Sequence, residues 1–282
     1  MHLVPKNVPA FVSVIIPVLN CEKTIEAQLQ AVAGQQYCGG FEIIVVDNGS
    51  RDSSSLIASS FASRTRIPVN ILNVRQAIGC GPARNVGVAK AKGDFFAFCD
   101  ADDQVQPGWL QGLSNALLDS HLAGGSDIFL YQRDGKSSWT WCAAEGKHLG
   151  VMPFARGGNF AARRSVFEAL GGFDPRRLHC EDIELCWRAQ LAGFTLKAVP
   201  DAIVVYRQRS TNWARLRQGF IWGVNEVGII VTLKVCRDNI RLREQTGVFR
   251  FGPIISGKAD PMLIGKRLGQ IFGCLRHRVR IW

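Results

Sequence analysis

The strongest constraint on the fold of this chain is a regular alternation of short apolar runs and amphipathic stretches over residues 11–125. The apolar runs are partly β-branched, which is typical of strands buried on both faces of a sheet, and they cover residues 11–18, 41–46, 69–72 and 95–99. Amphipathic stretches near residues 23–33, 53–62 and 82–91 separate them. Strands that alternate with helices predict an α/β fold, a mainly parallel sheet flanked by helices and joined by right-handed crossovers.

Polar residues, several of them acidic, follow three of these strands, over residues 17–22, 47–52 and 100–103. In parallel α/β sheets, ligands bind beyond the carboxyl ends of the strands. Asp47 follows the second predicted strand, and Asp100, Asp102 and Asp103 follow the fourth. Carboxylates this close repel one another unless a cation is present, and Mg²⁺ and Mn²⁺ prefer oxygen ligands. The cluster therefore predicts either a divalent metal site or a solvated turn before a helix near residue 107.

A second acidic pair begins a predicted helix over residues 181–191. Glu181 and Asp182 are explained by the favourable field at a helix N-terminus, unless one of them faces a cleft as a general base. Glu184 and Arg188 have the i,i+4 spacing of an ion pair that holds the start of this helix in place. A short helix over residues 164–170 and strands over 196–199 and 203–206 are also predicted, whereas residues 127–160 show no clear period.

Charge divides the chain into two parts. Residues 1–206 hold 19 basic and 19 acidic residues, whereas residues 207–282 hold 15 basic and 4 acidic residues and so carry the whole net charge of +11. We expect a first domain over residues 1–206, with halves at about 11–125 and 126–206. Residues 207–282 are expected to form a basic, mainly helical extension.

The basic extension favours a polyanionic partner. Its arginines are interleaved with aromatic residues, and Trp213, Leu216 and Phe220 follow helical spacing. Basic helices with aromatic faces lie on anionic bilayers, so we expect an anionic membrane surface as partner. The alternative is that the aromatic residues pack on the first domain and the arginines are merely solvated. No nucleic-acid partner is expected, because the first domain shows no nucleic-acid-binding pattern.

Several patterns are missing from the sequence. It contains no run of eighteen apolar residues, no recognisable secretory signal and, among nine cysteines, no Cys-x-x-Cys pair. These absences predict a chain without transmembrane spans, disulfide framework or structural zinc, and hence a cytoplasmic location, peripheral on the inner face of the plasma membrane if the extension binds lipid. Gly79 and Gly81 lack the third glycine of a dinucleotide-binding loop and follow the third strand, which disfavours a nicotinamide site.

Six groups of residues occur in an order that is more specific than any one group. They are Pro17 with Glu22, residues 45–50 with Asp52, residues 83–87, residues 100–103, residues 171–174, and Glu181 with Asp182. Over residues 11–210 this set resembles the family 2 inverting glycosyltransferases, which have the GT-A fold. The resemblance implies a metal-dependent site for a nucleotide-diphosphate sugar, usually on UDP and in some relatives on dTDP or GDP.

The resemblance also implies a nucleoside pocket. Carried over position by position, its lining would be Pro17, Glu22, Asp47 and Arg84. Many relatives have a histidine near the strand end at residue 206, where this chain has Arg207. If that group helps to bind the diphosphate, Arg207 replaces it as a cation.

The remaining implied roles concern the reaction itself. Asp102 and Asp103 would contact the ribose and a Mg²⁺ or Mn²⁺ ion, with Asp100 as support. Asp182 would be the catalytic base, and Glu181 beside it would help to position the acceptor. The implied reaction is one in-line displacement, in which a hydroxyl of a glycan, lipid-linked or small-molecule acceptor attacks the anomeric carbon and inverts it.

Two alternatives remain at this point. A sugar-phosphate nucleotidyltransferase uses a related sheet and metal carboxylates, but it would carry a glycine- and arginine-rich loop where this chain has Val18, Leu19 and Asn20. A non-catalytic nucleotide-sugar-binding protein is the other alternative, and the acids at both the metal and the base positions argue against it.

Overall fold

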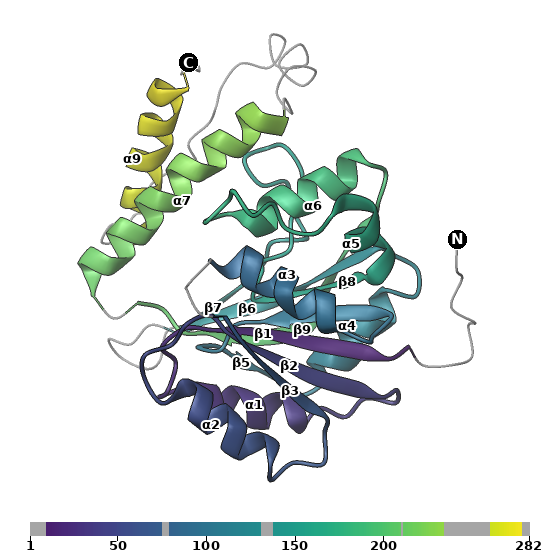
Figure 1. The fold of residues 1–282 in the computed structure, drawn as a ribbon. Coiled ribbons are helices and arrows are strands. Elements are labelled where there is room, and N and C mark those ends of the chain that lie inside the picture. Colours follow the sequence, from purple (N-terminus) through teal and green to yellow (C-terminus); the bar gives the residue numbers. More distant parts are fainter. Residues whose placement is uncertain (1–9, 75–78, 131–137, 210, 234–259, 278–282) are drawn as a thin grey trace. The chain divides into compact units, whose positions relative to one another are not determined.

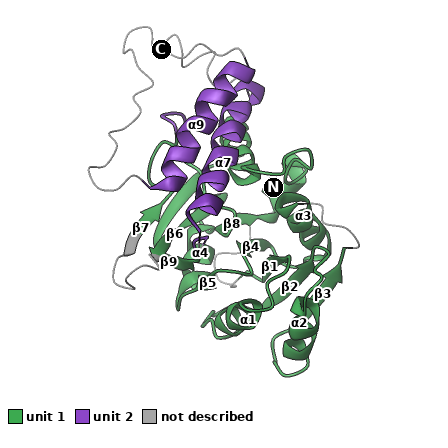
Figure 2. Cartoon of the chain, turned by 90° about the vertical axis from the view of Figure 1, so that its left-hand side faces the viewer, with its two compact units in different colours: residues 1–148, 152–207 green, residues 149–151, 208–282 purple. Residues whose placement is uncertain are grey.

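The structure, a computed structural model, describes residues 10–74, 79–130, 138–209, 211–233 and 260–277. The chain divides into two compact units, residues 1–148 with 152–207 and residues 149–151 with 208–282 (Figure 2). The first unit contains the sheet and its flanking helices, and the described part of the second contains two long helices.

The first half of unit 1 confirms the predicted alternation of strands and helices. Its elements are β1 (Val12–Val18), α1 (Ile25–Ala33), β2 (Phe41–Asp47), α2 (Ser54–Ala62), β3 (Val69–Asn73), α3 (Cys80–Lys90) and β4 (Phe95–Cys99). All pairings among these strands are parallel. The strands β1, β2 and β4 are buried along their whole length, as predicted. For β3 the prediction of burial on both faces is wrong, because β3 is the edge strand and is only partly covered.

The second half of unit 1 contains strands that the sequence pattern did not reveal. Its elements are β5 (Gln104–Val105), α4 (Trp109–Ala116), β6 (Leu122–Leu130), β7 (Ser138–Cys142), β8 (Asn159–Arg163), α5 (Arg164–Leu170), α6 (Glu181–Leu191) and β9 (Leu196–Tyr206). The helices α5 and α6 agree with the prediction, and Gly171 ends α5 in the left-handed conformation at φ 73°. The strands β6, β7 and β8 fall largely in the stretch that showed no clear period.

The last strand of the sheet is continuous. Two strands separated by a turn at Pro200 and Asp201 were predicted, and this prediction is wrong. Val199 pairs with Gly125 and Ile203 with the next residue, Ser126, so the three residues between them bulge without breaking β9. A bulge tolerates a proline, which has no N–H to give to the ladder, and the strand therefore passes through Pro200.

The order of the strands brings the two halves together. It is β3-β2-β1-β4-β8-β6-β9-β5, with β7 paired to β6. Because β8 runs antiparallel to β4, its first residue, Asn159, lies opposite the last residue of β4, Cys99. The residues that precede β8 therefore meet the residues that follow β4 at the same edge of the sheet.

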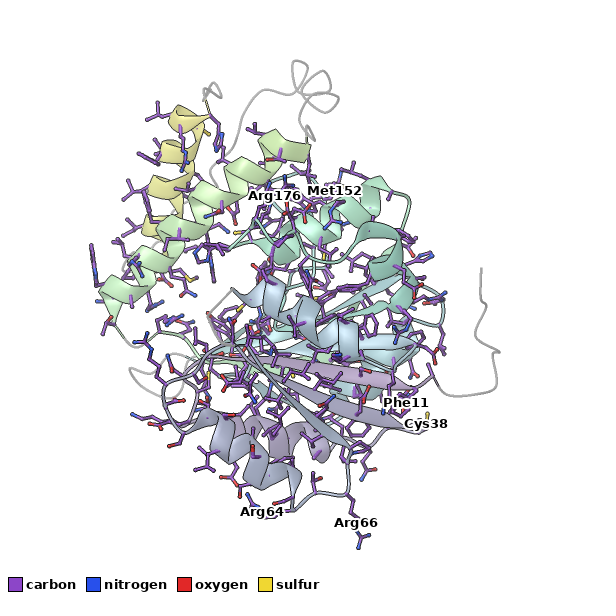
Figure 3. The ribbon with its side chains drawn as sticks, in the orientation of Figure 1. Phe11, Cys38, Arg64, Arg66, Met152 and Arg176 are labelled. Carbon is purple, nitrogen blue, oxygen red and sulfur yellow. The ribbon has the colours of Figure 1, made fainter. Side chains whose placement is uncertain are left out.

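Helices cover both faces of the sheet (Figure 1). On one face, α1, α2 and α4 pack on the sheet through a core that includes Leu29, Phe61 and Leu113. On the other face, the ring of Phe98 stacks on Phe160 of β8 with 4.7 Å between ring centroids. Side chains fill the space between these layers, whereas Arg66, after α2, projects outward (Figure 3).

The described part of unit 2 is a closely packed pair of helices, α7 (Asn212–Leu233) and α9 (Pro261–Arg276). Glycines lie at the interface: a Cβ added to Gly219 would lie 2.0 Å from the carbonyl oxygen of Met262, and one added to Gly265 would lie 1.9 Å from that of Leu216. The two backbones therefore touch. Among the described residues, no helix is long and apolar enough to cross a membrane.

Candidate functional site

The acidic cluster that follows β4 forms a preorganised loop. One carboxylate oxygen from each of Asp100, Asp102 and Asp103 lies within 4.8 Å of the others. Asp102 is exposed, Asp100 is partly buried and Asp103 is buried. The fully buried Gln28 of α1 holds the loop from below, because its amide donates to the carbonyl of Asp100 at 2.9 Å and accepts from the N–H of Val105 at 3.0 Å.

Arg84 lies beneath this loop and is only 2% exposed. Its Nη2 donates to Oδ1 of Asp100 at 2.7 Å, and its Nη1 donates to Oε1 of Glu181 at 2.6 Å. Burial lowers the pKa of the guanidinium, but the two carboxylates outweigh it and raise that pKa above its ordinary value. Arg84 thus joins the loop after β4 to the first residue of α6. Its expected contact with a nucleoside stays a prediction.

A second arginine, the partly buried Arg156, lies on the other side of the acidic cluster. Its Nε and Nη2 each donate to one carboxylate oxygen of Asp127 in β6, both at 2.8 Å. Nη2 also donates to Oδ2 of Asp103 at 2.8 Å, and Nη1 lies 3.4 Å from Oδ2 of Asp100. The guanidinium carbon lies 4.8 Å from the ring centroid of Tyr206. Arg156 therefore contacts three carboxylates and one aromatic face.

The two acids at the start of α6 differ in their surroundings. Glu181 is buried against Arg84, whereas Asp182 is partly exposed. Oδ2 of Asp182 accepts the backbone N–H of Gly157 at 2.7 Å, and Oδ1 accepts that of Ile183 at 2.8 Å. The predicted ion pair between Glu184 and Arg188 is present at 2.7 Å. Of the two acids, Asp182 is the more exposed.

The loops after β1 and β2 are joined where the nucleoside was expected. The N–H of Glu22 donates to Asp52 at 3.0 Å, and the carboxylate of Glu22 accepts the N–H of Ser53 at 3.2 Å. Asp47 is 6% exposed, and its Oδ1 accepts the N–H of Ser50 at 2.8 Å. Pro17 is buried at the end of β1. These residues lie at the carboxyl edge of the same parallel strands as the acidic cluster.

Arg207 is attached to the acidic cluster through its backbone. Its N–H donates to Oδ1 of Asp103 at 3.1 Å, and its side chain is exposed. Since Oδ2 of Asp103 already accepts from Arg156, both oxygens of this carboxylate are engaged.

Negative charge exceeds positive charge in the buried part of the site. Asp100, Asp103, Asp127 and Glu181 share two guanidinium groups. Burial raises the pKa of Asp103 to about 8 against the opposing field of Arg156, and it raises the pKa of Glu181 to about 7 against that of Arg84. It also raises the pKa of Asp127. A proton on a buried acid or a bound cation would each relieve this excess of acids over guanidinium groups.

Sequence reasoning missed Arg156, Asp127, Gln28 and Gly157 as parts of the site. One signal was available for Asp127, which is the only charged residue in the run over residues 122–130 and needs a buried partner there. Arg156 stands directly before two glycines, and Gln28 lies on the buried face of a helix, but neither position by itself identifies a partner.

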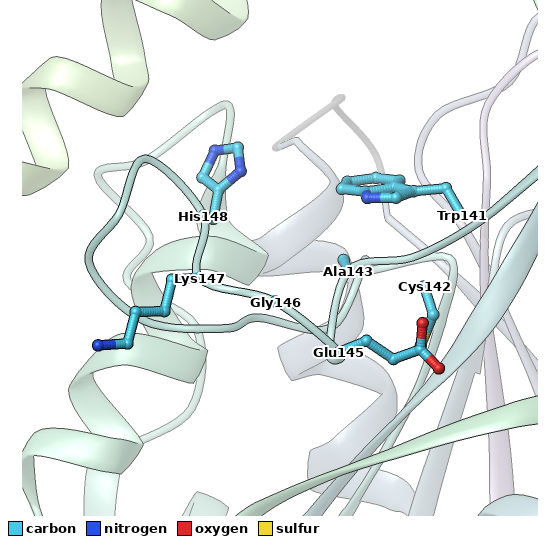
Figure 4. Close-up of a pocket in the computed structure, with 7 residues that line it drawn as sticks. All are labelled: Trp141, Cys142, Ala143, Glu145, Gly146, Lys147 and His148. Atoms are coloured by element: carbon cyan, nitrogen blue, oxygen red, sulfur yellow. The ribbon is translucent and has the colours of Figure 1, made fainter. Parts of the chain in front are cut away.

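A pocket of about 310 Å³ opens next to the site, between β7 and the loop that follows it (Figure 4). Its lining is Trp141, Cys142, Ala143, Glu145, Gly146, Lys147 and His148. Trp141 pairs with Asp127 in the ladder between β6 and β7. The rings of Trp141 and His148 lie 5.8 Å and 4.8 Å from the ring of Phe154, which stands two residues before Arg156.

Family profiles match most of the chain. Residues 13–171 match the profile described as Glycosyl transferase family 2, which covers more than half of the chain, and residues 95–257 match Glycosyl transferase family group 2. The chain belongs to glycosyl transferase family 2. The resemblance stated from the six motif groups is thereby confirmed.

Curated relatives of this glycosyl transferase family 2 chain are longer than the chain itself. Glycosyltransferase AglE of Haloferax volcanii is 32% identical over 202 residues, which are 68% of this chain and 66% of AglE. Probable glycosyltransferase YdaM of Bacillus subtilis is 31% identical over 236 residues, 73% of this chain and 55% of YdaM. The chain thus spans about half to two thirds of the length of these two relatives.

Solved structures confirm the GT-A fold. Mannosyltransferase PcManGT from Pyrobaculum calidifontis, in complex with GDP-Man and Mn²⁺, aligns with a TM-score of 0.62 at 20% identity over 95% of this chain and 70% of that one. Residues 1–349 of S. aureus TarS, in complex with UDP-GlcNAc, align with a TM-score of 0.58 at 19% identity over 78% of this chain and 66% of that one.

Proposed function

We propose that this family 2 chain is a metal-dependent inverting glycosyltransferase that moves a sugar from a nucleotide-diphosphate donor, UDP being favoured, to an acceptor hydroxyl. The observation that carries the proposal is the fixed connection between two acidic groups. The acidic cluster after β4 and the partly exposed Asp182 are joined through Arg84 with Glu181 and through residues 156–157. A transferase needs both a group that stabilises the leaving diphosphate and a base, held at one site.

The acidic cluster fits a hard divalent cation, because it offers only carboxylate oxygens within reach of one another. Asp102 is exposed, and the side chain of Asp100 is 24% exposed although its two oxygens accept from Arg84 and Arg156. The side chain of Asp103 is fully buried, so its carboxylate is not open to an ion. We therefore assign the metal contacts to Asp102 and Asp100, and we assign Asp103 to supporting the loop, in place of the expected pair Asp102 and Asp103. When bound, Mg²⁺ or Mn²⁺ supplies Lewis-acid neutralisation of the charge on the leaving diphosphate.

The residues of the chain divide the remaining work. The exposed side chain of Arg207 contributes a cation for the diphosphate, while Asp47, Glu22 and Pro17 lie where the nucleoside is expected. Asp182 takes the proton of the attacking hydroxyl, since each of its oxygens keeps an acceptor position beyond the one backbone N–H that it binds. A single displacement on the face opposite the diphosphate inverts the anomeric carbon.

The pocket at residues 141–148 is the proposed acceptor subsite. It combines an aromatic ring, Trp141, with the charged residues Glu145 and Lys147 beside His148 (Figure 4). An apolar wall with a few polar groups suits a sugar or another hydroxyl-bearing molecule. Residues 154–157 connect this pocket to Asp182, which supports its assignment as the acceptor subsite.

A donor screen tests the proposed function. Purified chain is incubated with UDP-, dTDP- and GDP-sugars and an excess of simple glycoside acceptors, and released nucleoside diphosphate is measured. We expect release with one donor, loss of release in chelator, recovery with Mg²⁺ or Mn²⁺, and an inverted anomeric configuration by NMR. A nucleotidyltransferase would release pyrophosphate from a nucleoside triphosphate instead, and a binding protein would bind a donor without releasing anything.

We further propose that unit 2 binds an anionic membrane surface. Four large apolar side chains along one side of α9, here called the α9 apolar face, are 40%, 50%, 40% and 69% exposed: Ile264, Leu268, Ile271 and Leu275. The interfacial glycines lie on the side of α9 that packs on α7. Because residues 207–282 carry 15 basic against 4 acidic residues, an anionic bilayer complements this face better than an uncharged partner does.

Vesicle flotation tests this binding. The wild-type chain should float with vesicles that contain anionic lipid, less with neutral ones, and less at high salt. Leu268→Glu should abolish flotation, whereas Leu56→Glu, an identical change at a 72% exposed leucine of α2, should not. A wild-type chain that stays in the soluble fraction would favour the packing explanation of the aromatic residues.

A further inference from the structure

Four consecutive residues connect the acidic cluster, the proposed base and the proposed acceptor subsite. The ring of Phe154 contacts two rings of the acceptor pocket, and its N–H donates to the carbonyl of Ala143 at 3.4 Å. The N–H of Ala155 donates to the sulfur of Cys186 in α6 at 3.4 Å. The side chain of Arg156 binds the acidic cluster, and the N–H of Gly157 binds Asp182. Residues 154–157 thus lie between the metal side and the base side of the site.

Arg156 is held by a residue of the sheet and in turn holds the acidic cluster. Two of its nitrogens donate hydrogen bonds to the two oxygens of Asp127, a residue within the ladder of β6. Nη2 also donates to Asp103. Asn159 reinforces the anchor, because its Nδ2 donates to the carbonyl of Ser126 at 2.8 Å and lies 3.3 Å from Oδ1 of Asp127. One planar guanidinium therefore fixes the position of the acidic loop relative to the central sheet.

Gly157 and Gly158, which follow Arg156, are closely surrounded by other groups of the site. A Cβ added to Gly157 would lie 2.8 Å from Nη1 of Arg84, and one added to Gly158 would lie 2.4 Å from Oδ2 of Asp100. The backbone of residues 157–158 therefore passes close beside both guanidinium groups and Asp100. A displacement of Arg156 would be transmitted to both Asp100 and the N–H that holds Asp182.

We propose that Arg156 is a positioning residue that sets the distance between the metal-binding carboxylates and the catalytic base. This inference rests on the proposed function. The competing explanation is that Arg156 is only a counter-ion for crowded carboxylates. A counter-ion needs one positive charge, which a lysine also supplies, whereas a positioning residue needs the rigid fork of donors that only arginine has. The bidentate grip on Asp127 favours positioning.

Measuring Mn²⁺ binding to the whole chain separates these explanations. The readout is the loss of the EPR signal of the free ion. We expect Arg156→Met and Arg156→Lys both to weaken Mn²⁺ binding, by about 10–100-fold for the methionine, the usual cost of losing a residue that orients metal ligands, and by less for the lysine. If Arg156→Lys binds Mn²⁺ as tightly as the wild type does, or if Arg156→Met binds it as tightly or more tightly, the proposal is overturned in favour of a counter-ion.

Arg164→Met is the matched control. Like Arg156, Arg164 is partly buried and stacks at 4.8 Å on an aromatic ring, here Phe96, but its hydrogen bonds go to the backbone carbonyls of Ala91 and Gly93, away from the acidic cluster. It should lower the melting temperature without changing Mn²⁺ binding. A loss of Mn²⁺ binding in this control equal to that in Arg156→Met would show a general effect of instability and overturn the proposal.

Hydrogen exchange supplies a readout that needs no metal. In Arg156→Lys, peptides that cover residues 100–103 and residues 181–183 should both exchange faster than in the wild type, although these segments lie far apart in the sequence. Unchanged exchange in either segment contradicts the proposal. If the wild-type chain binds no Mn²⁺, the metal part of the proposed function fails, and the exchange result still decides the role of Arg156.

Discussion

Asp182→Asn is the substitution whose consequences the structure defines most closely. Asp182 accepts one backbone N–H at each oxygen, from Gly157 at 2.7 Å and from Ile183 at 2.8 Å. Asparagine keeps one oxygen and replaces the other with an NH₂ group, so one of the two N–H donors would face another donor. Leaving such a donor without its acceptor costs about 1–3 kcal/mol.

Two magnitudes follow from this substitution. The melting temperature should fall by about 2–4 °C for each kcal/mol lost, for a domain of this size. Turnover should fall by about 10²–10⁴-fold, the usual effect of losing a general base, which corresponds to about 3–5 kcal/mol of barrier. Because a loss of about 1–3 kcal/mol is small beside the about 5–15 kcal/mol by which domains are stable, a folded variant that binds donor and does not turn over is the expected result.

The assay compares nucleoside diphosphate release, donor affinity by calorimetry and melting temperature. Glu184→Gln is the matched control, since Glu184 lies on the same helix, is 4% exposed, and accepts from Arg188 at 2.7 Å and 2.9 Å. It should lose as much stability or more and keep its turnover. Near-normal turnover in Asp182→Asn, together with an inactive Glu181→Gln, would refute the assignment and make Glu181 the base.

Three further predictions follow from other parts of the structure. Asp102→Asn should weaken Mn²⁺ binding with little change in melting temperature, whereas Asp103→Asn should lower the melting temperature clearly, because both oxygens of Asp103 are hydrogen-bonded; equal melting temperatures would contradict the assigned roles. Arg207→Met should raise the donor dissociation constant by about 10–100-fold if the guanidinium binds the diphosphate, as calorimetry would show, and unchanged affinity would remove it from the site. Gly265→Ala should destabilise the pair of α7 and α9 by about 1–3 kcal/mol, seen as faster hydrogen exchange in both helices, because its Cβ would meet a carbonyl oxygen at 1.9 Å; Gly228→Ala, with its nearest neighbour at 3.6 Å, should not.

The local pattern of the sequence was enough to predict the parallel half of the sheet. The strands β1, β2 and β4 are largely apolar runs, because each is buried on both faces and successive positions therefore favour apolar residues. Because ligands bind at the carboxyl ends of such strands, Asp47 and the acidic cluster were predicted to belong to a binding site. The helix α6 and the ion pair between Glu184 and Arg188 were also predictable, since both depend on residues within one turn of each other.

Only the tertiary structure decided which charged groups that are distant in the sequence meet. Asp102 and Asp103 are adjacent and chemically identical, yet one is exposed and the other is buried against Arg156, a residue 53 positions away. Arg84 and Glu181 are 97 positions apart, and their contact turns Arg84 inward. The pairing of Asp103 with Arg156 exists because β8 runs antiparallel beside β4 and brings residues 156–158 to the acidic loop. Strand order depends on the free energy of the whole sheet, and no local pattern of residues contains it.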